Sequence, residues 1–373
     1  MISDVLAKFR LLASPTPSGS AMRRVRSRRK SARAAVWSGV AAFAALTAGM
    51  AVAIDTVRPE WRDPEFALRL RQVREWKAKA PHRPLVLAFG SSRTQMGLSP
   101  AAMGLPDEPG SPVVYNFGYR AAHPLGVWFH FTRVLDSGVK PDAVLIQLAA
   151  PELMVRGNAE KQLGMWGPRF SRGDIALLLP YTKNDAVFRR AWLKSHLNPW
   201  TTYREPVISD LAPDWHTTRQ RKDFEWEQMD EYGFSRHPFS TIPLQRRREL
   251  EENVKRQHAR ALKSFAPGPT PEPVFRNLIE RCRAEGIEVA FYWAPESPAY
   301  QGWHAPASLA VIEEYKRWFA ARFPVPVFPA AEHLEELDFA DGYHLLPHGA
   351  AKYCRWLADN HLRPWLVSQG LAK

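Results

Sequence analysis

Five short apolar runs constrain the fold of this chain more than any other feature of its sequence. They cover residues 84–89, 113–117, 143–148, 287–293 and 325–328. Strands that are apolar on both sides belong in a parallel sheet covered on both faces. Between the runs, apolar side chains recur at helical spacing in 124–137, 273–285, 309–322 and 347–357. The sequence therefore predicts an α/β fold, a three-layer domain with a parallel five-stranded sheet.

The alternation of strands and helices stops between about 155 and 272. This segment contains many charges, several prolines and five tryptophans, and residues 245–263 read as a strongly charged helix. We interpret it as a mainly helical insertion in the domain and expect it to form a cap beside the active site. Its tryptophans can stack on sugar rings or lie in a core. They are Trp166, Trp192, Trp200, Trp215 and Trp226.

The N-terminal segment has the character of a membrane anchor. Residues 34–54 contain no charge, and their length suits one bilayer crossing. Residues 1–33 form a basic leader that carries +8 of the chain's net charge of +13, which weakens a nucleic-acid interpretation of the charge. The positive-inside rule places this leader in the cytoplasm and the residues after Asp55 outside, in the periplasm. A signal peptide cleaved near 51–53 and a buried soluble helix are the alternatives.

Two further regions complete the division of the chain. Residues 55–82 read as a charged helical stalk that lifts the domain off the membrane, and residues 83–373 form the domain with its insertion. The two cysteines, Cys282 and Cys354, have no metal-site spacing. Both fall in predicted helices, so they are either buried thiols or a disulfide. We expect no metal and no cofactor.

Polar residues follow the first and second predicted strands. Gly90 allows a tight turn after the first strand, and the serine after it then lies at a helix N-terminus, where backbone N–H groups favour an oxyanion. Ser91 and Ser92 both occupy this turn, and either can instead be a simple helix cap. After the second strand, Asn116 precedes Gly118, whose N–H can approach a substrate oxygen or belong to an ordinary turn.

Asp341 and His344 lie three residues apart on a short loop before the last predicted helix. An aspartate at this spacing can orient a histidine, which can then act as general base on a serine hydroxyl. The loop can equally be a solvated turn with an unrelated histidine. Because reactive groups in open α/β sheets collect at the carboxyl ends of the strands, we expect Ser92, Asp341 and His344 to meet there.

Taken together, these segments resemble the SGNH (GDSL-like) hydrolase superfamily. Gly90-Ser91-Ser92 is similar to the family's first block, with Ser91 at the usual aspartate position, and Asn116-Phe117-Gly118 is similar to the second. Asp341 and His344 match the last block. The third block departs from the family pattern, since Ala149 replaces its glycine and Pro151 replaces its asparagine. The similarity covers 83–154 and 285–362, about two-fifths of the chain.

The resemblance implies a triad of Ser92, Asp341 and His344, with the N–H groups of Ser92 and Gly118 as oxyanion donors. Arg93, Asn116 and His123 are the candidates for substrate contacts. The implied activity is an extracytoplasmic O-acyltransferase, with acetyl as the expected group, that acts on a cell-envelope or secreted polysaccharide.

The resemblance also implies partners and leaves alternatives. The expected partners are a glycan acceptor and a membrane-bound O-acyltransferase. A polysaccharide O-acetylesterase is one alternative, since the sequence does not separate transfer from hydrolysis. A non-catalytic scaffold or carbohydrate-binding subunit of a polymer export complex is another, because Pro151 removes the side-chain amide that the family uses in its oxyanion hole.

Overall fold

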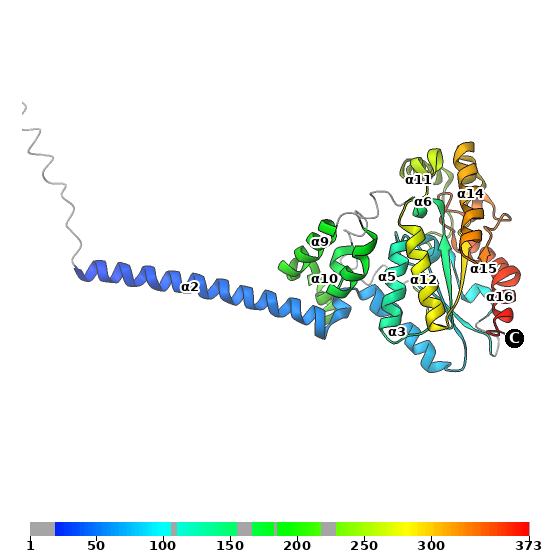
Figure 1. Cartoon of the computed structure of the whole chain (residues 1–373). Coiled ribbons are helices and arrows are strands. Elements are labelled where there is room, and N and C mark those ends of the chain that lie inside the picture. The colour runs from blue at the N-terminus through cyan, green and yellow to red at the C-terminus, as the bar shows by residue number, and fades with distance from the viewer. Residues whose placement is uncertain (1–18, 106–109, 155–165, 183–184, 218–228, 373) are drawn as a thin grey trace, which may run out of the picture.

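A computed structural model describes residues 19–105, 110–154, 166–182, 185–217 and 229–372 (Figure 1). Its centre is a five-stranded sheet in the order β2-β1-β3-β4-β5, in which every pair of neighbouring strands is parallel. The strands are β1 (Leu85–Phe89), β2 (Val113–Asn116), β3 (Ala143–Leu148), β4 (Glu288–Trp293) and β5 (Val327–Phe328). The predicted α/β fold with a parallel five-stranded sheet is confirmed.

Both faces of the sheet are covered because each strand alternates its side chains between them. Along β1, Leu85, Leu87 and Phe89 belong to one buried cluster, and Val86 and Ala88 belong to another. The first cluster is completed by α3 (Pro64–Lys79), α5 (Pro124–Asp136), α12 (Pro271–Glu285) and α14 (Pro306–Arg322). The second is completed mainly by α15 (Pro347–Leu357) and α16 (Arg363–Ser368). Each large apolar side chain fully buried here contributes about 1.5–3 kcal/mol.

The stalk predicted for residues 55–82 is wrong, because α3 is part of the domain. Its side chains Phe66, Leu70 and Val73 are buried in the first cluster. Arg69, on the same face, is fully buried and donates to the carbonyl of Asn116 at 2.8 Å. A stalk would present only solvated side chains, whereas this helix buries apolar residues at i, i+4 and i+7.

The insertion between β3 and β4 is divided into two parts. Its helices α9 (Asp185–Leu197) and α10 (Pro199–Leu211) lie against the end of the N-terminal helix, whereas α8 (Arg172–Leu178) packs on α5 in the first cluster (Figure 1). Of the insertion helices that the structure describes, α11 (Leu244–Ser264) is the one near the carboxyl edge of the sheet, against α14 and the short α6 (Ala150–Leu153). The predicted cap therefore corresponds to α11 and the loop before it. Residues 155–165 and 218–228, which include Trp226, lie outside the described part of the chain.

The N-terminal helix α2 (Gly19–Val52) projects from the domain as a single long rod (Figure 1). Between Lys30 and Val57 the chain is long and apolar enough to cross a membrane, and the domain buries very little of it. The uncharged span predicted at 34–54 falls inside this segment. A membrane anchor and a signal sequence both meet this description.

One edge of the sheet is closed by a turn from the insertion. The N–H of Asn116, at the end of β2, donates to the carbonyl of Tyr232 at 2.8 Å. The turn is held by Trp76 of α3, whose ring stacks on that of Tyr232 at 4.8 Å. At the opposite edge, β5 has only two residues.

The two cysteines do not form a disulfide. Cys282 belongs to the first apolar cluster and Cys354 to the second, so the sheet lies between them, and both are free and buried. Burial raises the pKa of each thiol to about 12. Both are therefore unreactive thiols inside the core.

Candidate active site

Ser92, His344 and Asp341 form a continuous hydrogen-bonded chain at the carboxyl edge of the sheet. Ser92 is the first residue of α4 (Ser92–Gly97), and its Oγ lies 2.8 Å from Nε2 of His344. Nδ1 of His344 lies 2.8 Å from Oδ2 of Asp341. With a proton on Nδ1, the imidazole donates to the carboxylate and accepts the hydroxyl proton of Ser92, which is the arrangement of a nucleophile with its general base.

The loop before α15 fixes the position of the Asp341 carboxylate. Its Oδ1 accepts the N–H groups of Tyr343 at 3.2 Å and His344 at 2.9 Å. Burial alone would raise the pKa of Asp341, but His344 and these two N–H groups lower it below its ordinary value. The tight turn requires Gly342, which has a φ of +96°. The carboxylate is thus ionised and held in place at neutral pH.

A buried glutamine holds the turn that carries the nucleophile. Oε1 of Gln147, near the end of β3, accepts the backbone N–H groups of Ser91 at 3.0 Å and Thr94 at 3.1 Å. It also accepts the Thr94 hydroxyl at 2.6 Å. A Cβ at Gly90 would lie 1.9 Å from Oγ1 of Thr94 and 2.6 Å from the Gln147 side chain, so only glycine fits there. Strand β3 therefore positions Ser92 through Gln147.

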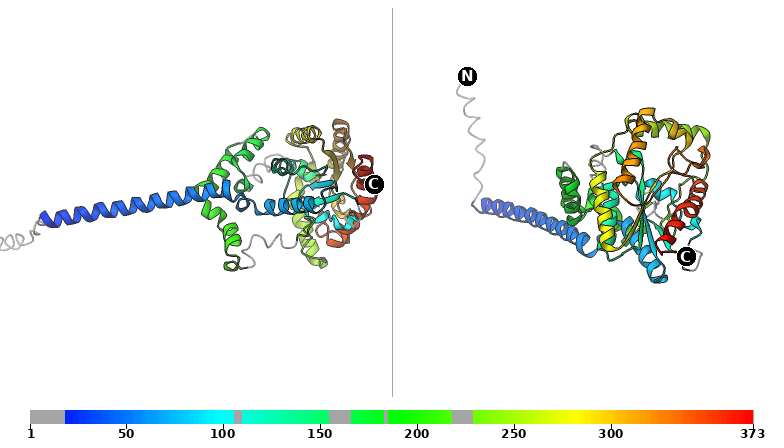
Figure 2. Two further views of the ribbon diagram at one scale, coloured as in Figure 1. Left: turned by 90° about the horizontal axis from the view of Figure 1, so that it is seen from below. Right: turned by 45° about the vertical axis from the view of Figure 1, so that its right-hand side comes forward.

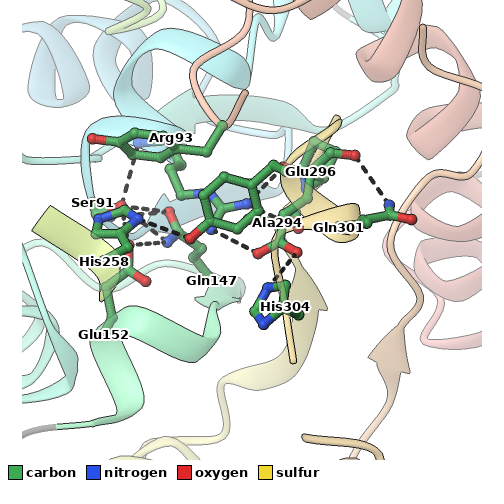
Figure 3. A network of polar contacts seen from close by, with 12 residues as sticks. Ser91, Arg93, Gln147, Glu152, His258, Ala294, Glu296, Gln301 and His304 are labelled. Carbon is green, nitrogen blue, oxygen red and sulfur yellow. Dashed lines mark hydrogen bonds and ion pairs between the residues drawn. The ribbon is translucent and has the colours of Figure 1, made fainter. Parts of the chain in front are cut away.

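Ser91 is used structurally, as the cap of α4. Its Oγ accepts the N–H of Arg93 at 3.3 Å and donates to Glu152 at 3.0 Å. Gln147 Nε2 also donates to it, at 2.9 Å (Figure 3). These contacts leave Ser92, the only one of the two serines bonded to His344, as the candidate nucleophile.

The oxyanion role predicted for Gly118 does not fit the structure. Its N–H donates to the side chain of Asn116 at 2.8 Å. A Cβ at Gly118 would come within 2.5 Å of the Gln95 nitrogen, so glycine is needed here for close packing on α4 rather than for substrate. The N–H of Ser92 has no hydrogen-bond partner in the described part of the chain. Ser92 alone of the two predicted donors remains available.

Two of the predicted substrate contacts are also structural. Asn116 is fully buried, and its amide donates to the carbonyls of Thr94 at 2.7 Å and Leu98 at 2.6 Å. The buried Arg93 donates to the carbonyl of Pro295 at 2.6 Å and lies 3.4 Å from Glu296 (Figure 3). Backbone carbonyls and an ion pair occupy these side chains, and neither of them lines the cavity described next.

A cavity of about 550 Å³ opens beside the triad. Ser92 and His344 contribute to its wall together with residues from the β2 and β3 ends and from α11. Its volume falls in the range of small-molecule sites, and polar and apolar groups share its lining. The further polar side chains of the lining are Ser91, Arg120, His123, Glu152, His237, Gln257, His258, Arg260 and Tyr343.

His123, the third predicted substrate contact, does line the cavity. Burial lowers its pKa to about 4, so the ring is neutral at physiological pH. Neither ring nitrogen has a hydrogen-bond partner among the residues described. Ala121, two residues before His123, has a φ of +59°, which few non-glycine residues adopt, so the turn before the ring is strained. His123 therefore offers an unused N–H donor at the site.

His258 and Glu152 belong to the cavity wall and were not predicted from the sequence as site residues. His258 on α11 bonds the Tyr300 hydroxyl at 2.8 Å, and burial, with a smaller contribution from Arg93, lowers its pKa to about 4. Glu152 follows β3 on α6, and burial raises its pKa although Arg93 opposes the shift. His258 was hidden in a helix that reads as solvated. Glu152 carried a signal, because it follows the end of a predicted strand.

The raised pKa of Glu152 predicts a pH-dependent stability. A carboxyl whose pKa is higher in the folded state stabilises the protein below its unfolded pKa and loses that contribution as pH rises through the folded value. Glu152→Gln should therefore increase Tm relative to the wild type at pH 8, with little difference at pH 4. Thermal unfolding at both pH values measures this. A variant whose Tm difference is the same at both would contradict the buried, proton-binding carboxyl.

Comparison with known proteins supplies no identity. The residues described in 19–372 contain no group of three or more His, Cys, Asp or Glu side chains that could hold a metal ion. No model of a known protein family matches the chain, and a search of the curated proteins finds no match. The geometry around Ser92 is therefore the feature of the molecule that bears on its function.

Proposed function

We propose that this chain is a membrane-anchored serine O-acyltransferase of the SGNH type, with an extracytoplasmic domain that transfers acetyl groups to a polysaccharide. The observation that carries the proposal is the chain of two 2.8 Å contacts from Ser92 through His344 to Asp341, beside a cavity. A scaffold or sugar-binding subunit would have no need for a hydroxyl, an imidazole and an ionised carboxylate in this order. The geometry thus favours an enzyme over a scaffold.

The mechanism follows from the proton positions in the triad. His344 Nε2 takes the proton of the Ser92 hydroxyl while Oγ attacks the ester carbonyl, and Asp341 stabilises the imidazolium that forms. When the tetrahedral intermediate collapses, His344 returns the proton to the leaving alkoxide, and the acyl group remains on Ser92. In the second half, His344 takes the proton of an acceptor hydroxyl, whose oxygen attacks the acyl-serine. When the bond between the acyl group and Oγ breaks, His344 returns the proton to Oγ and Ser92 is regenerated.

Oxyanion stabilisation is provided in this proposal by two donors. The N–H of Ser92 is the first, since it has no partner in the described residues. Pro151, which lines the cavity where the family has asparagine, has no side-chain amide to donate. The neutral ring of His123 lines the same cavity and has an unused nitrogen. We assign it the second donor role, which was predicted only as a substrate contact.

The acceptor surface differs from the one that the tryptophan-rich insertion suggested. Trp192 and Trp200 belong to α9 and α10, near the N-terminal helix, and neither lines the cavity. Gln257 and His258 of α11 do line it. His123 replaces only one of two lost donors, since the Gly118 N–H donates to Asn116 and Pro151 has no amide, and loss of one oxyanion donor typically costs about 100- to 1000-fold in turnover. An acceptor held beside the acyl-serine can recover several kcal/mol by positioning, so transfer is favoured over hydrolysis. An O-acetylesterase is the second candidate.

In this proposal the acyl group reaches Ser92 from a donor on the membrane side. An anchored domain stays close to a membrane-bound O-acyltransferase, which we propose as the partner that supplies the acyl group. The basic leader and the uncharged span of 34–54 support the orientation with the domain outside the cytoplasm.

One experiment tests both the acyl-serine and its fate. The full-length protein is incubated with 4-nitrophenyl acetate and a model oligosaccharide, and the protein and sugar are analysed by mass spectrometry. The expected results are one acetyl group on the peptide that contains Ser92 and acetylated sugar in excess over the amount formed without enzyme. Absence of any acetyl-protein would contradict the proposed chemistry. Rapid acetate release that is indifferent to the sugar would identify an esterase.

A further inference from the structure

Large apolar side chains are exposed on α9, α10 and the turn Pro213–Trp215 that follows them. Leu197 is 68% exposed and Trp215 is 81% exposed. Leu193, Trp200 and Leu211 are exposed as well. Isolated apolar side chains are ordinary on protein surfaces, but a concentration of this kind within 23 residues marks an interaction surface. Such a surface needs an occupant that lies beside α9 and α10.

The position of these helices is fixed by their contacts with the end of the N-terminal helix. Ile54 packs with Tyr203 and Val207 of α10, and Met50 packs against the same cluster. Ile54 is the last residue of the uncharged span. Since an α-helix rises 1.5 Å per residue, the contact with Met50 lies about 6 Å inside the end of that span. Helix α10 is therefore level with the last apolar turn of the anchor.

Polar contacts lock the same region. His196 of α9 lies 3.0 Å from Asp55, the first charged residue after the span. Trp61 donates its ring N–H to Asp210 of α10 at 2.9 Å. Figure 2 shows the green helices of the insertion on both sides of the end of the blue N-terminal helix, away from the sheet. They are thus held around the exit of the anchor.

We propose that residues 185–215 form a membrane collar that lies in the headgroup region of the outer face of the membrane and binds its lipids. The inference rests on the retained anchor of the proposed function. Tryptophan is enriched at this level of a bilayer, where its apolar ring and its N–H are both satisfied. Trp200 and Trp215 of the collar have that character, and Leu193 and Leu197 are one helical turn apart and so share a face.

The collar binds through apolar contact rather than through charge. Its basic residues are balanced by an equal number of acidic ones. The basic residues are Arg189, Arg190, Lys194 and Arg204, and the acidic ones are Asp185, Glu205, Asp210 and Asp214. Attraction to anionic lipid depends on an excess of basic residues, which the collar lacks. Binding should therefore depend little on anionic lipid or on salt.

The test places spin labels on the full chain in nanodiscs of phosphatidylcholine. Leu197→Cys and Trp215→Cys report on the collar. Leu337→Cys, which replaces a side chain with the same 68% exposure as Leu197, is the matched control beside α15, whose His348 lies 3.1 Å from the Leu337 carbonyl. The native thiols are buried and do not compete for label. Accessibility is measured to oxygen, which enters lipid, and to a nickel chelate, which stays in water.

Labels at 197 and 215 should be more accessible to oxygen than to nickel, and the label at 337 should show the reverse. Replacing part of the lipid with phosphatidylglycerol should leave this difference unchanged. Labels at 197 and 215 that behave like the one at 337 would overturn the proposal. So would protection that appears only in native membranes, since the surface would then belong to a protein partner.

Two readouts separate this result from failure of the proposed function. An N-terminal tag shows whether the anchor is retained, and a cleaved anchor would overturn both the topology and the collar. Turnover of 4-nitrophenyl acetate by the labelled variants reports on the triad alone. Labels in lipid without turnover would keep the collar and reject the acyl chemistry. Turnover with a retained anchor and labels in water would support the acyl chemistry and reject the collar.

Discussion

Ser92→Ala should lower turnover of an activated acyl ester by at least about 1000-fold, because removal of a triad nucleophile leaves only binding and oxyanion stabilisation. Ser92 is the only serine of the turn bonded to His344, at 2.8 Å. Its replacement removes one hydroxyl at the cavity wall and should leave Tm nearly unchanged. Initial rates with 4-nitrophenyl acetate, together with thermal unfolding, measure both effects.

Ser91→Ala is the matched control for this change. It removes a helix cap, which typically costs about 1 kcal/mol of stability, and it deprives Glu152 of a hydrogen bond. We expect a measurable fraction of the activity to remain, with a lower Tm. An inactive Ser91→Ala beside an active Ser92→Ala would show that the nucleophile is one residue earlier than proposed.

Gln147→Leu should destabilise the protein by about 2–6 kcal/mol, because two buried backbone N–H groups lose their acceptor at about 1–3 kcal/mol each. These groups belong to Ser91 and Thr94, on either side of the nucleophile. The turn should shift and activity should fall together with stability. Denaturant unfolding measures the free energy of unfolding, and ester turnover shows whether Ser92 has left its position beside His344.

Gln147→Glu tests whether an acceptor oxygen at this position is what stabilises the turn. A glutamate keeps an oxygen toward the two N–H groups, but it puts a second carboxyl next to Glu152, which already lies 3.3 Å from Nε2 of Gln147. The variant should therefore be more stable than Gln147→Leu at pH 5 and lose part of that advantage at pH 8, where the two carboxylates repel. Equal stability of the two variants at pH 5 would contradict the role of the acceptor.

The sheet could be predicted from the sequence because its strands carry their own signal. Runs such as 143–148 are apolar on both sides, and only a strand covered on two faces uses them. The meeting of Ser92 with His344 followed from the same argument, since parallel strands bring their carboxyl ends to one edge. Both expectations depended only on where the strands lie and on their being parallel. Short apolar runs with helices between them indicate both.

The failed predictions depended on side-chain partners that no local pattern reveals. Asn116 could equally point its amide at substrate or at the carbonyls of Thr94 and Leu98, and the packing of α4 decides for the carbonyls. The side-chain oxygen of the same asparagine accepts the N–H of Gly118. The contact between Gln147 and the turn joins residues far apart in the sequence, so the third block appeared only as a lost asparagine.

The sequence also did not indicate that the insertion is divided between the N-terminal helix and the cavity. Helices α9 and α11 are both charged, and each carries tryptophan or histidine side chains that suit a cap. Which of them lies at the cavity depends on long-range contacts, such as that between His258 and Tyr300 for α11 and that between His196 and Asp55 for α9. The stalk prediction failed for a similar reason, because the charges of α3 concealed the apolar face of Phe66, Leu70 and Val73.

The closed edge of the sheet has a consequence for how this protein avoids aggregation. An open strand edge is a template on which other chains can pair. At the end of β2, the N–H of Asn116 donates to the carbonyl of Tyr232, and Arg69 donates to the carbonyl of Asn116. At the other edge, β5 is too short to template a partner. Shortening the 229–235 turn would expose the β2 edge and promote strand-to-strand self-association without touching the triad.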